Sequence, residues 1–124
     1  DNTFFLSAIR GFGDEVKGVT GEVVLTFAPD GALTTEYRDW RITAVSEGVE
    51  MTITRTGTDL GRFEATDSTV TLEDTELGST LVMSAAGTET AVDPAPVAYT
   101  DAPYTCDASG AEITTPDGAL RLLR

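Results

Sequence analysis

The sequence predicts an all-β protein in which an antiparallel meander of about 8–10 short strands closes into a β-barrel. Runs of alternating apolar and polar side chains recur along the chain, and clusters of turn residues separate them roughly every 8–12 residues. The stretch from Trp40 to Phe63 shows this pattern most clearly, because Ile42 and Ala44 share a side with Trp40 and a turn containing Gly48 follows. A period of two, interrupted by glycine-containing turns, is typical of half-buried strands joined by hairpins.

Residues 1–18 differ from this pattern. Phe4, Ala8 and Phe12 recur every four residues, as they would on one face of an α-helix. We therefore expect a short helix over Thr3–Gly11 that caps one end of the barrel, followed by a connector to residue 18. The two adjacent phenylalanines also suit the start of a strand, so this alternative stays open.

A meander of strands is predicted over residues 21–86. Its first hairpin turn is Pro29-Asp30-Gly31, in which proline presets φ and glycine accepts a positive φ. The passage from Ala32 to Val45 is long for one strand, so we expect a bend near Asp39. Each strand is expected to pair with its neighbours in sequence. The predicted strands cover residues 21–28, 32–39, 40–45, 49–56, 60–65, 69–74 and 79–86.

Residues 89–103 form an irregular, proline-rich segment. Pro94, Pro96 and Pro103 lack the backbone donor that a central strand needs, which predicts a loop across an end or an edge of the sheet. Residues 104–124 then supply the closing strands. Closure into a barrel removes the exposed sheet edges; a two-sheet sandwich is the alternative architecture.

The composition indicates one domain, residues 1–124, and excludes several functions. With 8 basic and 21 acidic residues the chain carries a formal net charge of −13, which disfavours nucleic acid and anionic membranes as partners. No apolar run approaches the ~20 residues of a membrane-spanning helix. The chain has no histidine and one cysteine, Cys106, which excludes Ser-His-Asp and Cys-His catalysis, His-containing zinc sites and an intrachain disulfide. Cys106 alternates with Tyr104 and is expected to point inward. We expect a monomer with no catalytic residues, no metal and no cofactor.

Three segments carry a resemblance to a known family. They are Thr20–Phe27, reading T-G-E-V-V-L-T-F; Tyr37–Trp40, reading Y-R-D-W; and a late segment from Pro103 to Leu122 that contains a Pro-Asp-Gly turn. Their order resembles lipocalin-like domains of secreted or cell-envelope proteins in actinobacteria. The resemblance implies a lipocalin-like barrel, an extracellular or cell-envelope location, and either carriage of a small apolar ligand or an accessory role in an envelope protein.

The candidate ligand-binding residues are large side chains expected in the barrel interior. They are Tyr37, Trp40, Met51, Phe63 and Met83. The same residues could instead fill the barrel as ordinary core. A cavity of ~300 Å³ or more with one or two polar groups would favour ligand binding. The alternatives are a protein-interaction module that uses the proline-rich loop and hairpin tips, and a carboxylate-dependent enzyme, which would need two carboxyl groups and an arginine converging in a cleft.

Overall fold

The protein is built from antiparallel β-strands throughout the described part of the chain. A computed structural model describes residues 2–10, 15–116 and 118–124, and these residues form no helix. The strands are β1 (Asn2–Arg10), β2 (Glu15–Phe27), β3 (Ala32–Ser46), β4 (Val49–Ala65), β5 (Thr69–Leu77), β6 (Thr80–Ala85), β7 (Thr88–Val92), β8 (Ala98–Cys106), β9 (Gly110–Thr115) and β10 (Gly118–Leu123).

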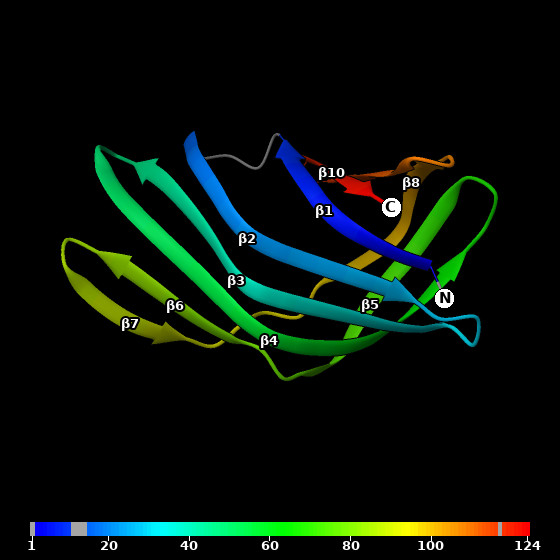
Figure 1. Cartoon of the computed structure of the whole chain (residues 1–124), viewed down its shortest axis with the longest axis horizontal. Coiled ribbons are helices and arrows are strands. Elements are labelled where there is room, and N and C mark those ends of the chain that lie inside the picture. The colour runs from blue at the N-terminus through cyan, green and yellow to red at the C-terminus, as the bar shows by residue number, and fades with distance from the viewer. Residues whose placement is uncertain (1, 11–14, 117) are drawn as a thin grey trace.

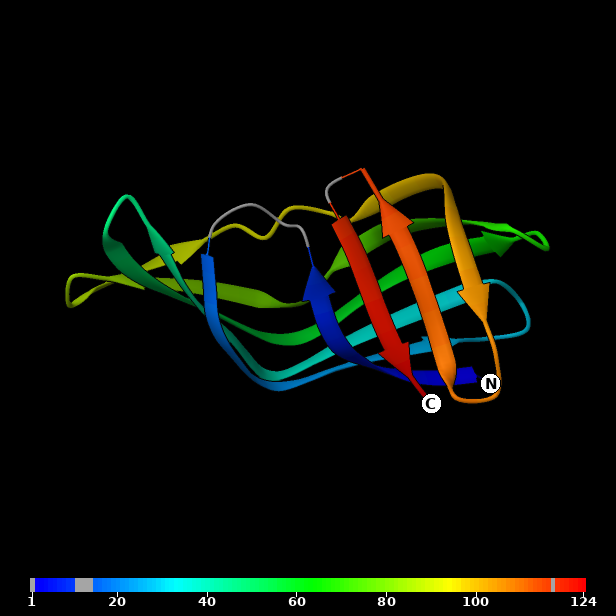
Figure 2. The same cartoon turned by 90° about the horizontal axis from the view of Figure 1, so that it is seen from above.

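Eight of these strands close into a barrel. The order runs β1-β2-β3-β4-β5-β8-β9-β10, and β10 pairs with β1 to complete the ring. Figure 2 shows β8, β9 and β10 side by side along one wall. Closure leaves the barrel strands paired on both sides, which is how antiparallel sheets remove their edges.

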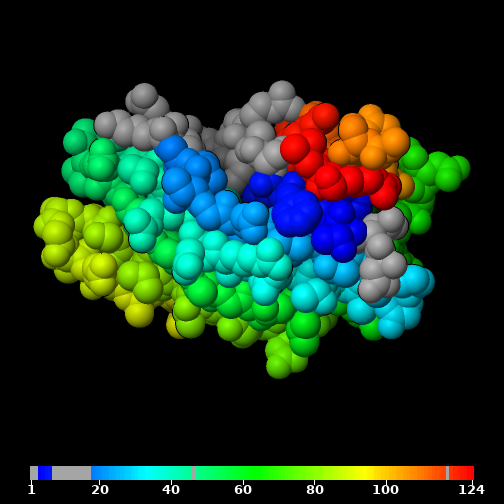
Figure 3. Space-filling model, viewed as in Figure 1, coloured from blue at the N-terminus to red at the C-terminus, as the bar shows by residue number. Residues whose placement is uncertain are grey.

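Three barrel strands, β2, β3 and β4, continue well beyond the barrel and, together with β6 and β7, extend the same sheet. Residues 51–56 of β4 pair with β6, whereas residues 59–65 pair with β5, so one strand serves two sets of neighbours. We call this part of the sheet the sheet extension; it comprises residues 15–20 of β2, 40–46 of β3, 49–56 of β4, and strands β6 and β7. The extension projects to the left of the barrel in Figure 1, and the β6–β7 hairpin lies far from β8 and β10 in Figure 3.

The extension bends away from the barrel along a line of three backbone irregularities. The register between β2 and β3 shifts beside Gly21, and the register between β3 and β4 shifts beside Asp39, opposite Gly57. All three residues have a positive φ, of 80°, 48° and 119° respectively. Bulges in neighbouring strands bend a sheet locally and increase its twist. The bend expected near Asp39 is therefore present, but β3 runs through it as one strand.

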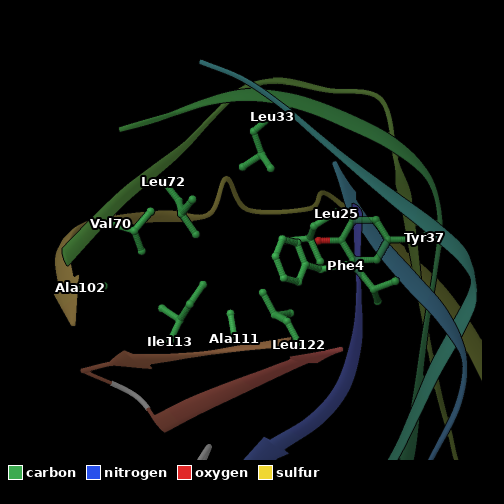
Figure 4. Packing of buried hydrophobic residues seen from close by; sticks show 11 residues of the cluster. Phe4, Leu25, Leu33, Tyr37, Val70, Leu72, Ala102, Ala111, Ile113 and Leu122 are labelled. Carbon is green, nitrogen blue, oxygen red and sulfur yellow. The ribbon is translucent and has the colours of Figure 1, made fainter. Parts of the chain in front are cut away.

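Apolar side chains from opposite walls point into the barrel (Figure 4). The end away from the extension is filled by aromatic rings: Phe27 packs edge-on against Phe4 at 5.6 Å and against Phe63 at 4.9 Å between ring centroids. Such contacts stabilise a core beyond their area alone. The rest of the core cluster comprises Val23, Leu25, Leu33, Tyr37, Val70, Leu72, Ala102, Ala111, Ile113 and Leu122.

The expected N-terminal helix is wrong. The described part of Thr3–Gly11 belongs to β1, where Phe4 is buried and Phe5 is 39% exposed, as in a strand. Tertiary structure explains the difference, because the barrel closes only if this segment pairs with both β2 and β10. Phe12, Gly13 and Asp14 lie outside the described residues, and the rest of the expected connector, residues 15–18, belongs to β2.

Four further expectations need correction. Residues 89–103 are not one loop: β7 covers their beginning, β8 their end, and Pro103 stands within β8 opposite Thr69. Pairing does not follow sequence order throughout, because β5 pairs with β8 while β6 returns to β4. The break predicted between residues 56 and 60 is absent, since Gly57 lets β4 continue. Cys106, the last residue of β8, is exposed.

The bend at Gly21 predicts a specific intolerance to a side chain. A Cβ atom at Gly21 would lie 2.2 Å from the backbone oxygen of Asp39, whereas one at Gly48, which has nearly the same φ, would contact nothing. Gly48→Ala should cost about 1–2 kcal/mol of unfolding free energy for its left-handed backbone. Gly21→Ala should cost more, because β3 must also shift. Urea unfolding of both variants measures this, and equal losses would contradict the assignment.

Candidate functional site

A cavity of about 390 Å³ runs from the barrel interior onto the inner face of the sheet extension. Its barrel part is lined by Leu25, Leu33, Leu72, Ile113 and Leu122, and its outer part by Val19, Trp40, Ile42, Ala44 and Ile53. The aromatic residues at the opposite end of the barrel do not reach it. Its size falls within the ~300–1,000 Å³ range of small-molecule sites, which are also mostly apolar.

A second hollow, of about 490 Å³, lies beside β8 and the end of β9. It is lined by residues 98–103 and 114–116, most of which are exposed to solvent. This hollow has the larger volume, but it lies among exposed side chains and does not enter the barrel. The cavity that enters the barrel is therefore the better candidate site.

Four polar side chains line the cavity where the extension joins the barrel: Thr35, Tyr37, Arg55 and Asp74. We call them the polar belt. Along β3, Thr35 and Tyr37 lie between Leu33 on the barrel side and Trp40 on the extension side. Along β4, Arg55 follows Ile53 toward the barrel, and along β5, Asp74 follows Leu72 toward the extension. The belt thus separates two apolar parts of one cavity.

Behind the belt, Asp59 forms a buried ion pair with Arg55. Asp59 is 0% exposed, and its Oδ2 accepts a hydrogen bond from Nη2 of Arg55 at 2.7 Å. Its Oδ1 accepts from the backbone N–H groups of Gly78 and Ser79 at 3.1 and 3.0 Å. Nε of Arg55 donates to Oγ of Ser79 at 3.0 Å. A buried charge persists only when it is paired and hydrogen-bonded in this way.

This ion pair lies where β4 changes partners. Gly78 and Ser79 link β5 to β6, and they approach β4 so closely that a Cβ on Gly57 would be 2.8 Å from the Cα of Ser79. The Asp59 carboxylate accepts hydrogen bonds from the backbone of this link, and Arg55 donates a hydrogen bond to the Ser79 side chain. The pair therefore fixes the junction and, with it, the position of the Arg55 guanidinium in the cavity wall.

Tyr37 presents a protonated hydroxyl to the cavity. Burial, reinforced by the negative charges of Asp59 and Asp74 and opposed by Arg55, raises the pKa of Tyr37 to about 12. The Arg55 guanidinium carbon lies 4.3 Å from the centre of the Tyr37 ring, and the Trp40 ring centroid lies 5.8 Å away. Among the described residues, the Tyr37 hydroxyl has no hydrogen-bond partner, so it is available to a bound molecule.

Asp74 ties the segment after β7 to the cavity wall. Its Oδ2 accepts from the Val97 N–H at 2.9 Å, and its own N–H donates to the Val97 oxygen at 2.8 Å. Burial raises the pKa of Asp74, as does the charge of Asp59, while the Val97 bond and Arg55 oppose the shift. Val97 itself lines the cavity, so part of the proline-rich segment expected as an interaction surface forms a wall of this site.

The structure separates the five predicted site residues. Tyr37 and Trp40 line the cavity together. Met51 and Met83 pair with Ala44 and Ile53, so they continue the same face of the extension, beyond the cavity lining. Phe63 belongs to the aromatic end of the barrel.

Sequence reasoning missed Arg55 and Asp74. Both occupy inward positions of a period-two pattern, Arg55 after Met51 and Ile53, and Asp74 after Val70 and Leu72. A charged residue at an inward-facing position of a strand is the signal in the sequence that could have identified them, because a buried charge needs a specific partner.

Among the described residues, neither a metal-binding cluster nor a pair of accessible carboxyl groups lies at the cavity. Within them, no group of three His, Cys, Asp or Glu side chains is arranged to hold a metal ion. Two carboxyl groups and an arginine do converge, but Asp59 is buried with both oxygens engaged, which leaves Asp74 as the carboxyl group that faces the cavity. In the same part of the chain, no helix is long and apolar enough to cross a membrane.

Comparisons with known proteins identify no family model that matches this chain, and no curated protein or solved structure matches it either. The barrel is compatible with the lipocalin-like resemblance in fold.

We expect Asp59→Ala to lower the unfolding free energy by about 3–5 kcal/mol, because it leaves the Arg55 charge buried without its partner. The matched control is Glu36→Ala, which removes a carboxylate from the exposed pair with Arg38 (side chains 53% and 42% exposed) and should leave stability nearly unchanged. Urea titration measures both. Similar effects of the two substitutions would show that the junction does not depend on the buried pair.

Asp74→Asn should stabilise the protein increasingly as the pH rises. The pKa of Asp74 is held above its ordinary value of 3.8, so the folded state keeps the proton to a higher pH than the unfolded state does. The free energy of unfolding of the unsubstituted protein, relative to Asp74→Asn, therefore falls from pH 3.8 up to the folded pKa and then levels off. Arg55 and Asp59 are the charges next to this group. Asp67→Asn, in an exposed turn, controls for net charge, and a pH-independent difference would sink the prediction.

Proposed function

We propose that this protein is a noncatalytic binding domain for a small, largely apolar molecule held in the cavity of the barrel and extension. The observation that carries the proposal is a cavity of about 390 Å³ with apolar walls and a few convergent polar groups. Both features are typical of small-molecule sites. A proposed location outside the cytoplasm rests on the lipocalin-like resemblance.

Binding is favoured over catalysis by the state of the charged groups. General acid–base or nucleophilic chemistry by paired carboxylates needs both groups to reach the substrate. Asp59 has no exposed surface, and its oxygens already accept three hydrogen bonds. The ion pair and the Ser79 hydrogen bond hold Arg55 in place beside the Tyr37 ring, which suits recognition of a ligand.

Native mass spectrometry of the protein purified from its own source tests the proposal directly. A retained lipid-like molecule is the expected result. A neutral apolar dye, N-phenyl-1-naphthylamine, tests the same cavity in recombinant protein, with the fluorescence of Trp40 as a second signal. If neither a retained molecule nor dye binding is found, the proposal is wrong.

Ala44→Phe should weaken dye binding about tenfold or more, because the ring fills the mouth of the cavity. Ala44 is half-buried in the cavity wall, so the fold should tolerate the larger side chain. Thr43→Phe is the matched control, since Thr43 lies on the opposite face of β3 with its hydroxyl 3.5 Å from that of Thr52. The two dissociation constants, with circular dichroism to check folding, give the answer. An equal loss in both variants would contradict binding in the cavity.

A further inference from the structure

The position of the polar belt within the cavity limits the shape of the ligand. A site for a simple fatty chain would place its polar groups at the mouth. Here Tyr37 and Arg55 lie in the middle, with Leu33 deeper in the barrel and Ile42 farther out on the extension. A molecule that fills the cavity must therefore place a polar group between two apolar parts.

The belt offers both donors and an acceptor to that group. The Tyr37 hydroxyl remains protonated and has no partner among the described residues. Nε and Nη2 of Arg55 donate hydrogen bonds, whereas Nη1 has no partner among the described residues. Every side-chain nitrogen or oxygen there that lacks a hydrogen bond is at least partly exposed, so Nη1 faces the cavity that Arg55 lines. Asp74 accepts its hydrogen bond through Oδ2, which leaves Oδ1 as an acceptor.

The charges of the belt disfavour an anionic group. Arg55 is neutralised by its ion pair with Asp59 at 2.7 Å. Asp74 lies close enough to be influenced by both charges. These three side chains therefore sum to zero or to one negative charge, depending on the protonation of Asp74. A carboxylate brought among them would meet no uncompensated positive charge and would lose its hydration.

We propose that the ligand is a two-armed amphiphile, with an uncharged amide-type group at the polar belt, one apolar arm in the barrel and a second arm against the sheet extension. An amide matches the belt because its carbonyl oxygen accepts from Tyr37 and Arg55 while its N–H donates to Asp74. This inference rests on the proposed function of the cavity and adds the chemical class of its ligand.

Three probes of equal carbon number test the inference: N-octyldecanamide, octyl decanoate and octadecanoate. Trp40, the single tryptophan, lines the cavity and reports binding by its fluorescence, and displacement of N-phenyl-1-naphthylamine provides a second readout. The amide should bind about 2–10-fold tighter than the ester, as expected for one added hydrogen bond, and tighter still than the carboxylate. Tyr37→Phe should weaken amide binding about 2–10-fold. Asp74→Asn should narrow the gap between amide and carboxylate.

The second arm has its own test. Ile42→Asn should weaken N-octyldecanamide several-fold more than N-methyldecanamide, which lacks the second arm, while the control Thr43→Asn on the opposite face changes neither. Binding of octadecanoate as tight as that of the amide would overturn the ligand class and leave the proposed function standing. Equal effects of Ile42→Asn on both amides would overturn the second arm. Failure of every probe and of the dye to bind would overturn the proposed function itself.

Discussion

The architecture depends on one buried carboxylate. Strand β4 belongs to the barrel over one half of its length and to the sheet extension over the other, so its neighbours must change within a few residues. Asp59 stabilises the change by binding the backbone of Gly78 and Ser79 and the side chain of Arg55. Hydrogen bonds to an ionised group are among the strongest that proteins make, and they are stronger still away from water. The carboxylate therefore fixes the β5–β6 link against β4 at the point where the barrel passes into the sheet extension.

The same junction shapes the cavity. The end of the barrel away from it is closed by the rings of Phe4, Phe27 and Phe63. The end at the junction stays open because three strands continue outward and carry an apolar face with them. Arg55 is anchored there by the contacts that secure the fold, so a structural ion pair also supplies a rigid polar group to the ligand. Polar residues in an otherwise apolar interior break the alternation of apolar and polar side chains, and such departures are expected at functional sites.

The sequence predicted the features that depend on local patterns. Alternation around Trp40 and Ile53 predicted strands with an inward apolar face, and the bend near Asp39 followed from the length of the run. Prediction from the sequence failed where long-range strand pairing overrides the local pattern. The four-residue spacing from Phe4 predicted a helix, with a strand as the alternative, and only the need to close the barrel decides for the strand. Gly57 looked like a turn residue, yet it lies within a continuous strand. There its positive φ of 119° and its missing side chain let Gly78 and Ser79 approach the backbone closely.

By itself, then, the sequence determined the all-β class, the inward positions of Tyr37 and Trp40, and the exclusion of histidine-dependent chemistry, because each follows from residue type and from a period of two. The tertiary structure alone decided that β6 returns to β4, that the barrel is open at one end, and that Arg55, Asp59 and Asp74 meet. These residues come from different strands or from opposite sides of a bulge. Their proximity arises from the register of long-range pairs, which no local pattern encodes.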